Sequence, residues 1–262
     1  MAVDKQYFFD AVRQSLFNGS LSDTQVAVMD GILDSFAGPH DQLAYILATP
    51  YHEVGRALEP VAENLNYTAK RMTEVWPTRF KTLAAAKPYA GNPEALGNKV
   101  YGGRLGNALN EGYRYRGRGL SQITGKENYT KFGKLMSLDL AGNPDLALQP
   151  KIAARILVVG MRDGLFTGKR LTDFIFNGTV DYVNARRIIN GDVKTNGEKI
   201  AGYAKKFRAA LREPAVAVGL PPIVAPAPVP TSSNKPSGSG WTVIVTIVGG
   251  IIAAILKALG WF

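Results

Sequence analysis

A change of composition near residue 213 limits where a folded domain can lie in this chain of 262 residues. Residues 213–240 consist largely of Pro, Ala, Val, Ser and Gly, with prolines at every second position from Pro226 to Pro230. Such a segment is semi-rigid where proline recurs and flexible where Ser and Gly dominate, so it serves as a linker. The sequence therefore predicts one folded domain over residues 1–212 and a separate segment over residues 241–262.

Residues 241–262 form an apolar run in which Lys257 is the one charged side chain. A helix of this length, with a rise of about 1.5 Å per residue, would span roughly 33 Å, and a bilayer core is about 30 Å thick. Trp241 and Trp261 stand near its two ends, where aromatic side chains favour the membrane interface. We expect a transmembrane-type helix that associates with a membrane.

Apolar residues at helical spacing recur through the first 212 residues and predict a mainly α domain with little strand. Ser22 and Gln25 have the spacing of a capping box, which marks the start of one helix. Residues 88–115 are rich in Gly and Asn and predict a long loop with at most one short helix, of the kind that lines a binding site. We expect helices over residues 4–17, 22–37, 41–53, 68–75, 126–136, 150–163, 171–176, 182–189 and 196–211.

Three glutamates lie close together in residues 51–67, namely Glu53, Glu59 and Glu63. Glu53 ends an apolar helical pattern that Pro50 is expected to kink or break. A carboxyl group fixed at a half-buried helix end can have a raised pKa and keep its proton near neutral pH, as a general acid must. Two carboxylates in different environments are the minimum for hydrolysing a glycosidic bond, because one protonates the leaving oxygen and the other activates water.

Composition excludes several kinds of active site. The chain has no Cys, which excludes disulfides, thiol nucleophiles and cysteine-ligated metals. It has two histidines, His40 and His52, and no H-E-x-x-H spacing, so we expect no metal site. The formal net charge of +10 favours a polyanionic partner, which can be nucleic acid, an anionic membrane or a bacterial wall polymer.

Aromatic and arginine residues alternate in the segment 113–124, which includes Tyr115 and Arg118. If the segment is extended, the two kinds of side chain point to opposite faces. Such a surface can stack on nucleic-acid bases and hold phosphates, or stack on sugars while Arg118 positions a carboxylate. A solvated edge strand would have the same composition.

Several motifs together resemble the chitinase-like family-19 glycoside hydrolases, in the form found in bacteriophage endolysins and related bacterial lysozymes. The resemblance covers roughly residues 40–210 and implies a helix-rich, lysozyme-like, two-lobed fold with long loops lining a sugar cleft, an inverting mechanism and no cofactor. The matching segments are residues 51–53, 63–67, 100–107, 115–119, 122–124, 128–129 and 187–191.

The resemblance assigns roles to individual residues. It implies that Glu53 is the general acid and that Glu63 is the base that polarises the attacking water. The other residues that match the family motifs would position the substrate or the attacking water, except that the arginine would instead have a structural or charge-setting role. These residues are Thr124, Gln122, Asn190, Arg118, Tyr115 and Asn128. The chain departs from the family after the acid, where it reads Glu-Val-Gly-Arg in place of Glu-Thr-Gly-Gly, and Glu59 is a competing candidate for the base.

The predicted function is an endolysin that hydrolyses β-1,4 bonds of peptidoglycan for host cell lysis, since the basic charge favours the anionic wall over neutral chitin. The alternatives are a chitinase, a lytic transglycosylase and a non-catalytic wall-binding module. We expect glycan strands as the partner, a membrane contact through residues 241–262, no nucleic acid and a monomer. The protein would be made in the host bacterial cytoplasm, since its N-terminus lacks the apolar core of a secretory signal, and would act on the wall in the periplasm. The sequence leaves open the wall chemotype and which of the two alternating bonds is cut.

Overall fold

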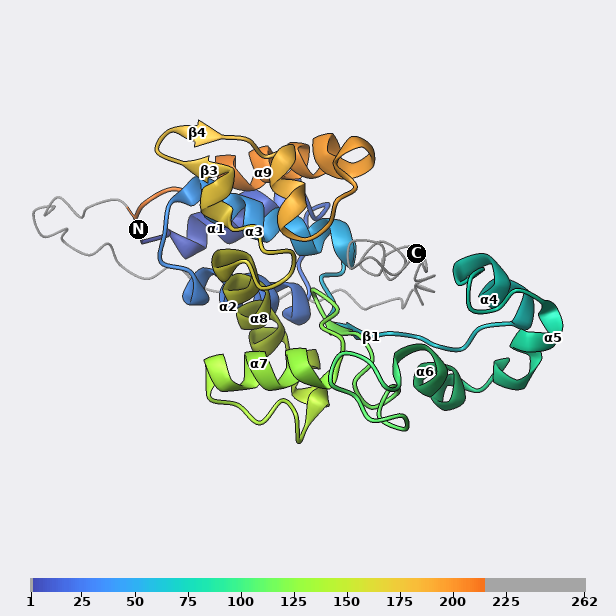
Figure 1. Ribbon diagram of the computed structural model, residues 1–262. Helices are drawn as coiled ribbons and strands as arrows, with labels where there is room; N and C mark the ends of the chain where they lie inside the picture. Colours follow the sequence, from blue (N-terminus) through green and yellow to red (C-terminus); the bar gives the residue numbers. More distant parts are fainter. Residues whose placement is uncertain (1, 215–262) are drawn as a thin grey trace, which may run out of the picture.

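The computed structural model describes residues 2–214, which form a mainly helical domain (Figure 1). The α-helices are α1 (Lys5–Ser15), α2 (Asp23–Ser35), α3 (His40–Glu53), α4 (Ala69–Val75), α5 (Leu83–Ala86), α6 (Pro93–Tyr101), α7 (Lys126–Met136), α8 (Pro150–Asp163) and α9 (Glu198–Ala210). Short 3-10 helices lie at Lys87–Tyr89, Pro144–Leu148, Leu171–Asp173 and Asn184–Ile188, and a π-helical turn lies at Val193–Gly197. The strands are β1 (Val61–Ala62), β2 (Arg118–Gly119), β3 (Ile175–Phe176) and β4 (Thr179–Val180).

Local signals place several helices where the sequence predicted them. The capping box at the start of α2 is confirmed, because the Ser22 side chain accepts from the Gln25 N–H and the Gln25 side chain accepts from the Ser22 N–H. Helix α7 spans Lys126–Met136 and α8 spans Pro150–Asp163, as expected. Proline opens α8, and Gly164 ends it in the left-handed conformation, with φ of 72°.

Helix α3 is the buried centre of the main hydrophobic cluster and packs along α9, while α2 packs along α8. Of the kink or break expected at Pro50, the break does not occur, since α3 continues through Pro50 to Glu53 and the Val54 N–H still bonds the Pro50 carbonyl at 3.0 Å. An internal proline costs a helix about 3 kcal/mol. Nearly every side chain of α3 is buried, and this burial offsets that cost and fixes Glu53 at the helix end.

Two of the predicted helices are wrong in type. Residues 171–176 form a 3-10 turn followed by strand β3, and residues 182–189 contain a 3-10 helix in place of an α-helix. The signal for the first error is Asn177-Gly178, since both residues have positive φ (47° and 83°) and join the β3–β4 hairpin as a two-residue turn. An Asn-Gly pair between short apolar runs is the usual sequence of such a hairpin.

A second cluster lies apart from the main one and is built by α4, α5 and α6 around Trp76, Phe80 and Tyr101 (Figure 1). A third cluster forms under α7 around Tyr129 and Phe132. The chain passes from α3 towards the second cluster through β1, which pairs antiparallel with β2. This short sheet therefore lies where the segments from the three clusters meet.

The predicted fold class included a transmembrane-type helix, and this part needs correction. Over residues 2–214 the structure has no helix that combines the length and the apolar character needed to cross a membrane. Even α3 and α8 have 14 residues each, whereas a span needs about 20. The segment 241–262, on which the prediction rested, lies outside the described residues, as does nearly all of the linker 213–240. The supported fold class is a mainly helical domain.

Candidate active site

Glu53 is held at the C-terminal end of α3 by a buried arginine from a distant part of the chain. An Arg186 Nη1 donates to Glu53 Oε1, and both side chains are buried. The same guanidinium pairs with Asp192, with its Nε 2.5 Å from Oδ1. Burial raises the pKa of Glu53, and the charge of Arg186 opposes this rise. The carboxyl group is thus positioned rigidly and retains its proton more readily than an exposed glutamate.

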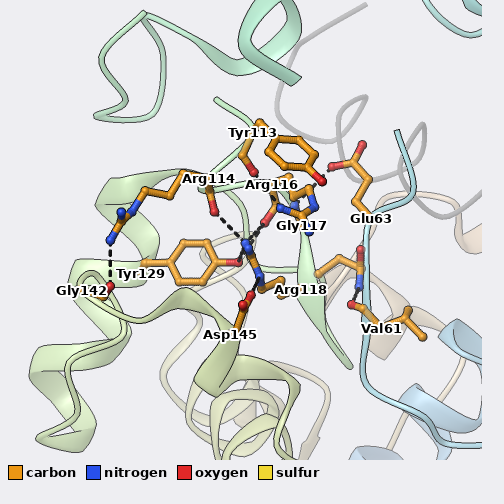
Figure 2. Close-up of polar contacts among 11 residues, drawn as sticks. Val61, Glu63, Tyr113, Arg114, Arg116, Gly117, Arg118, Tyr129, Gly142 and Asp145 are labelled. Carbon is orange, nitrogen blue, oxygen red and sulfur yellow. Dashed lines mark hydrogen bonds and ion pairs between the residues drawn. The ribbon is translucent and has the colours of Figure 1, made fainter. Parts of the chain in front are cut away.

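Glu63 follows β1 and is buried in a different environment. Its Oε1 accepts a hydrogen bond from the Tyr101 hydroxyl at 2.8 Å, and its Oε2 accepts from the Gly117 N–H at 3.2 Å. Figure 2 shows this carboxylate beside the backbone of residues 113–117. Burial raises the pKa of Glu63 to about 7, although Tyr101, Gly117 and Arg116 each favour the charged form. A carboxylate with a pKa near neutral can serve as a general base.

Gln122 links the two strands of the small sheet that carries Glu63. Its Nε2 donates to the Val61 carbonyl at 2.7 Å and to the Gly119 carbonyl at 2.9 Å. Its backbone has a φ of 51°, which is strained for a side chain with a Cβ. The two hydrogen bonds stabilise this conformation, and both donors of the amide are used within the protein.

Gly117 marks the point where three of the predicted site residues meet. A Cβ at this position would lie 2.8 Å from Gln122 Oε1, 3.4 Å from Thr124 Oγ1 and 3.5 Å from Glu63 Cβ. A side chain at this position would push against the Gln122 amide, which two carbonyls hold in place, so glycine favours the close approach of these groups. The structure thus brings Glu63, Gln122 and Thr124 together.

Thr124 and Asn128 form the edge of a pocket of about 240 Å³ next to this group. The Thr124 hydroxyl donates to the Gln122 carbonyl at 3.0 Å, and Asn128 Nδ2 donates to the Thr124 carbonyl at 2.8 Å. Ile189 lines the same pocket from the segment that carries Arg186. The pocket lining thus combines residues of the segment 121–124 with one residue of the segment that carries Arg186.

Asn190 follows this isoleucine and is buried. Its N–H donates to the Arg186 carbonyl at 2.9 Å, which ties it to the residue that pairs with Glu53. The structure thus divides the predicted residues into a group around Glu63 and a group around Glu53.

Arg118 and Tyr115 are buried within the protein and do not form an exposed stacking surface. Arg118 donates to Asp145 at 2.7 Å, to the carbonyls of Arg114 and Arg116, and to the Tyr129 hydroxyl (Figure 2). Tyr115 packs in the third cluster, and its hydroxyl donates to the Ala141 carbonyl at 3.0 Å. Two interpretations of segment 113–124 were open, an extended face that stacks on a ligand and a solvated edge strand. Neither describes Tyr115 and Arg118, because both are buried. Both set the path of the chain towards Gly117.

Arg186 and Tyr101 are the contacts that the sequence did not predict. Arg186 lies 133 positions from Glu53, and Tyr101 lies 38 positions from Glu63. Tyr101 belongs to a segment that matches the family resemblance. Arg186 directly precedes the matching segment 187–191, but nothing in the sequence indicates that it pairs with Glu53. Glu59 is exposed. Within residues 2–214 no cluster of His, Asp and Glu could hold a metal ion.

We expect Arg186→Met to be strongly destabilising, because it leaves the buried Glu53 without its cation. Removing one partner of a buried ion pair costs about 3–5 kcal/mol. The raised pKa of Glu53 means that the folded state binds more protons than the unfolded state, so this group lowers stability as pH rises through its ordinary pKa. Without Arg186 this effect grows, and the loss should be larger at pH 8 than in acid.

Denaturant unfolding at several pH values measures this loss. The exposed neighbour gives a matched control, since Arg187→Met removes the same charge from the surface and should change stability little. Equal effects of the two substitutions, or a loss that does not depend on pH, would contradict the role given to Arg186.

A second prediction concerns the pKa of Glu63. Tyr101→Phe removes a hydrogen bond that favours the ionised carboxylate, so the pKa of Glu63 should rise further above about 7. If Glu63 acts as a base, the acid limb of the pH–activity profile should move to higher pH. Tyr89→Phe, in the same hydrophobic cluster, is the control and should leave the profile unchanged.

Comparison with known proteins relates part of this chain to one family. No family model matches the sequence. Over 119 residues, 42% of this chain, it is 39% identical to a curated Haemophilus influenzae protein described as a glycosyl hydrolase family 19 domain-containing protein, and it spans 59% of the length of that relative.

Solved structures with distant similarity include two chitinases. Chitinase C from Streptomyces griseus HUT6037 has 16% sequence identity, with 79% of this chain and 76% of that chain covered and a TM-score of 0.49. A bacterial family 19 chitinase has 17% identity, with 80% and 95% covered and a TM-score of 0.44. Through those 119 residues the chain is similar to a protein described as a glycosyl hydrolase family 19 domain-containing protein.

Proposed function

We propose that this protein is an endolysin-type glycoside hydrolase that cleaves β-1,4 bonds in the glycan strands of bacterial peptidoglycan. The observation that carries the proposal is the pair of buried carboxyl groups, each with a raised pKa and each in its own environment. One is paired with an arginine, and the other accepts hydrogen bonds from a tyrosine hydroxyl and a backbone N–H. The similarity to a glycosyl hydrolase family 19 domain-containing protein supports the reaction class.

The proposed reaction is a single displacement. Glu53 donates its proton to the glycosidic oxygen as the bond from that oxygen to the anomeric carbon breaks. Glu63 accepts a proton from a water molecule whose oxygen adds to the anomeric carbon from the opposite face, so the configuration inverts. Thr124 lies beside Glu63 across Gly117, where its hydroxyl can hold this water. The base assigned to Glu63 favours hydrolysis over lytic transglycosylation, which needs an acid and no water-activating base.

The net charge of +10 favours an anionic wall polymer over neutral chitin as substrate. Such an enzyme would act on the wall of the host cell. Tyr115 and Arg118, which a stacking face for bases would have to present, are buried, and this argues against nucleic acid as the partner.

Mass spectrometry of the fragments released from purified peptidoglycan tests the proposal. Hydrolysis leaves a reducing sugar at each new end, and the identity of that sugar shows which alternating bond is cut. Anhydro ends would instead identify a transglycosylase, and cleavage of chitin oligosaccharides alone would identify a chitinase. Proton NMR of the first-formed anomer tests inversion, since a retained anomer excludes the single displacement.

A further inference from the structure

The pocket lined by Gln122 and Thr124 carries charged side chains that the acid–base reaction does not use. Helix α7 contributes three polar residues to its wall, Glu127, Asn128 and Lys131, which lie on neighbouring turns of the helix. Phe132 and Phe166 form an apolar part of the lining. A glycan bound across Thr124 and Asn128 would therefore pass close to an ammonium group.

Lys131 has no anionic partner within residues 2–214. The ion pair of α7 in this part of the chain joins Lys126 to Glu111, at 2.8 Å, and Lys131 forms none. Glu127 is one helical turn away from Lys131, yet the two do not pair. The ammonium group is thus available to a ligand in the pocket.

We propose that Lys131 selects glycans that carry carboxylates, so that this pocket discriminates peptidoglycan from neutral chitin. Lysine is a compact point charge on a flexible stem and can meet a carboxylate without a fixed geometry. Chitin has no carboxylate, whereas alternate sugars of peptidoglycan carry a lactyl ether and, on it, a stem peptide with acidic residues. Glu127 on the same wall disfavours a carboxylate on its own side and so restricts the acidic group to Lys131. This inference rests on the proposed function and names its substrate class.

The test compares steady-state kinetics of Lys131→Met on three substrates. These are intact peptidoglycan, peptidoglycan glycan stripped of its stem peptides by an amidase, and neutral chitin oligosaccharides. Because Lys131 is exposed, its ion pair with substrate is worth at most about 1 kcal/mol, so we expect a two- to fivefold rise in KM on the acidic substrates with kcat unchanged. On the neutral oligosaccharide, KM should not change. A larger effect on the stripped glycan assigns the carboxylate to the lactyl group, and a larger effect on intact wall assigns it to the stem peptide.

Lys134→Met is the matched control, since Lys134 is an exposed lysine on the same helix that does not line the pocket. It lowers the net charge by the same amount and should leave KM near the wild-type value on all three substrates. Lys131→Arg keeps the charge and should restore most of the affinity. Raised salt should weaken wild-type binding to the acidic substrates towards the Lys131→Met value.

Two results would overturn the inference while leaving the proposed function intact. One is an equal rise in KM on neutral and acidic glycans, which indicates lost packing, and the other is an equal effect of Lys134→Met, which indicates bulk charge. A wild-type enzyme that cleaves none of the three substrates would refute the proposed function itself, and the selectivity of Lys131 with it.

Discussion

Glu53→Gln should reduce the rate of wall hydrolysis by about 10²- to 10⁴-fold, the usual contribution of a general acid. The amide has nearly the same shape as the carboxyl group but cannot deliver a proton to the leaving oxygen. Arg186 keeps its contact with Asp192, so the surrounding structure retains one of its two ion pairs. Turbidity clearing of purified cell walls by equal amounts of wild type and variant measures the effect.

A loss of activity assigns a catalytic role to Glu53 only if the Glu53→Gln variant is folded. Circular dichroism and thermal unfolding should show a native protein, and cosedimentation with insoluble wall should show that it still binds substrate. Near-normal clearing by a folded, wall-binding Glu53→Gln variant would remove Glu53 from the reaction.

Glu63→Gln should be almost as severe, because the amide cannot accept a proton from the attacking water. The amide oxygen can still accept from the Gly117 N–H, and the amide nitrogen can donate to the Tyr101 hydroxyl, which can act as an acceptor, so the local structure should persist. The same clearing assay, supplemented by single-turnover rates on a soluble glycan fragment, measures the loss.

Glu59→Gln is the control for this assignment. Glu59 lies between the two candidates in sequence but is exposed, and its substitution should change activity little. The opposite order of effects, with Glu59→Gln severe and Glu63→Gln mild, would move the base to Glu59 and require a different reading of the site.

The sequence predicted those parts of the fold that neighbouring residues decide. The limits of α7 and α8 follow from apolar spacing, from Pro150 and from Gly164, all of which act within a turn of the helix end. The start of α2 follows from Ser22 and Gln25 for the same reason. The β3–β4 hairpin was also predictable from Asn177-Gly178, although the apolar spacing of residues 171–176 suggested a helix.

Tertiary structure decided whether the helix continues through Pro50 and whether the side chains of segment 113–124 are exposed. Local rules predict that a proline disrupts a helix, but α3 is buried along nearly its whole length and continues to Glu53. Alternation predicts that Tyr115 and Arg118 face opposite sides of a strand, yet both are buried and bonded to other segments. Burial of a whole segment can outweigh a local preference worth a few kcal/mol, and only the packed structure gives the burial.

For the candidate site, the sequence alone named the candidate carboxylates and the tertiary structure decided their environments. The spacing of the glutamates and the resemblance to a family were enough to name Glu53 and Glu63 as candidates, with Glu59 as a rival for the base. Their partners Arg186 and Tyr101 come from elements far along the chain, and it is these partners, together with burial, that set the pKa of each carboxyl group. A titratable side chain takes its chemistry from whatever packing brings within a few ångströms, and sequence neighbours supply few of those groups.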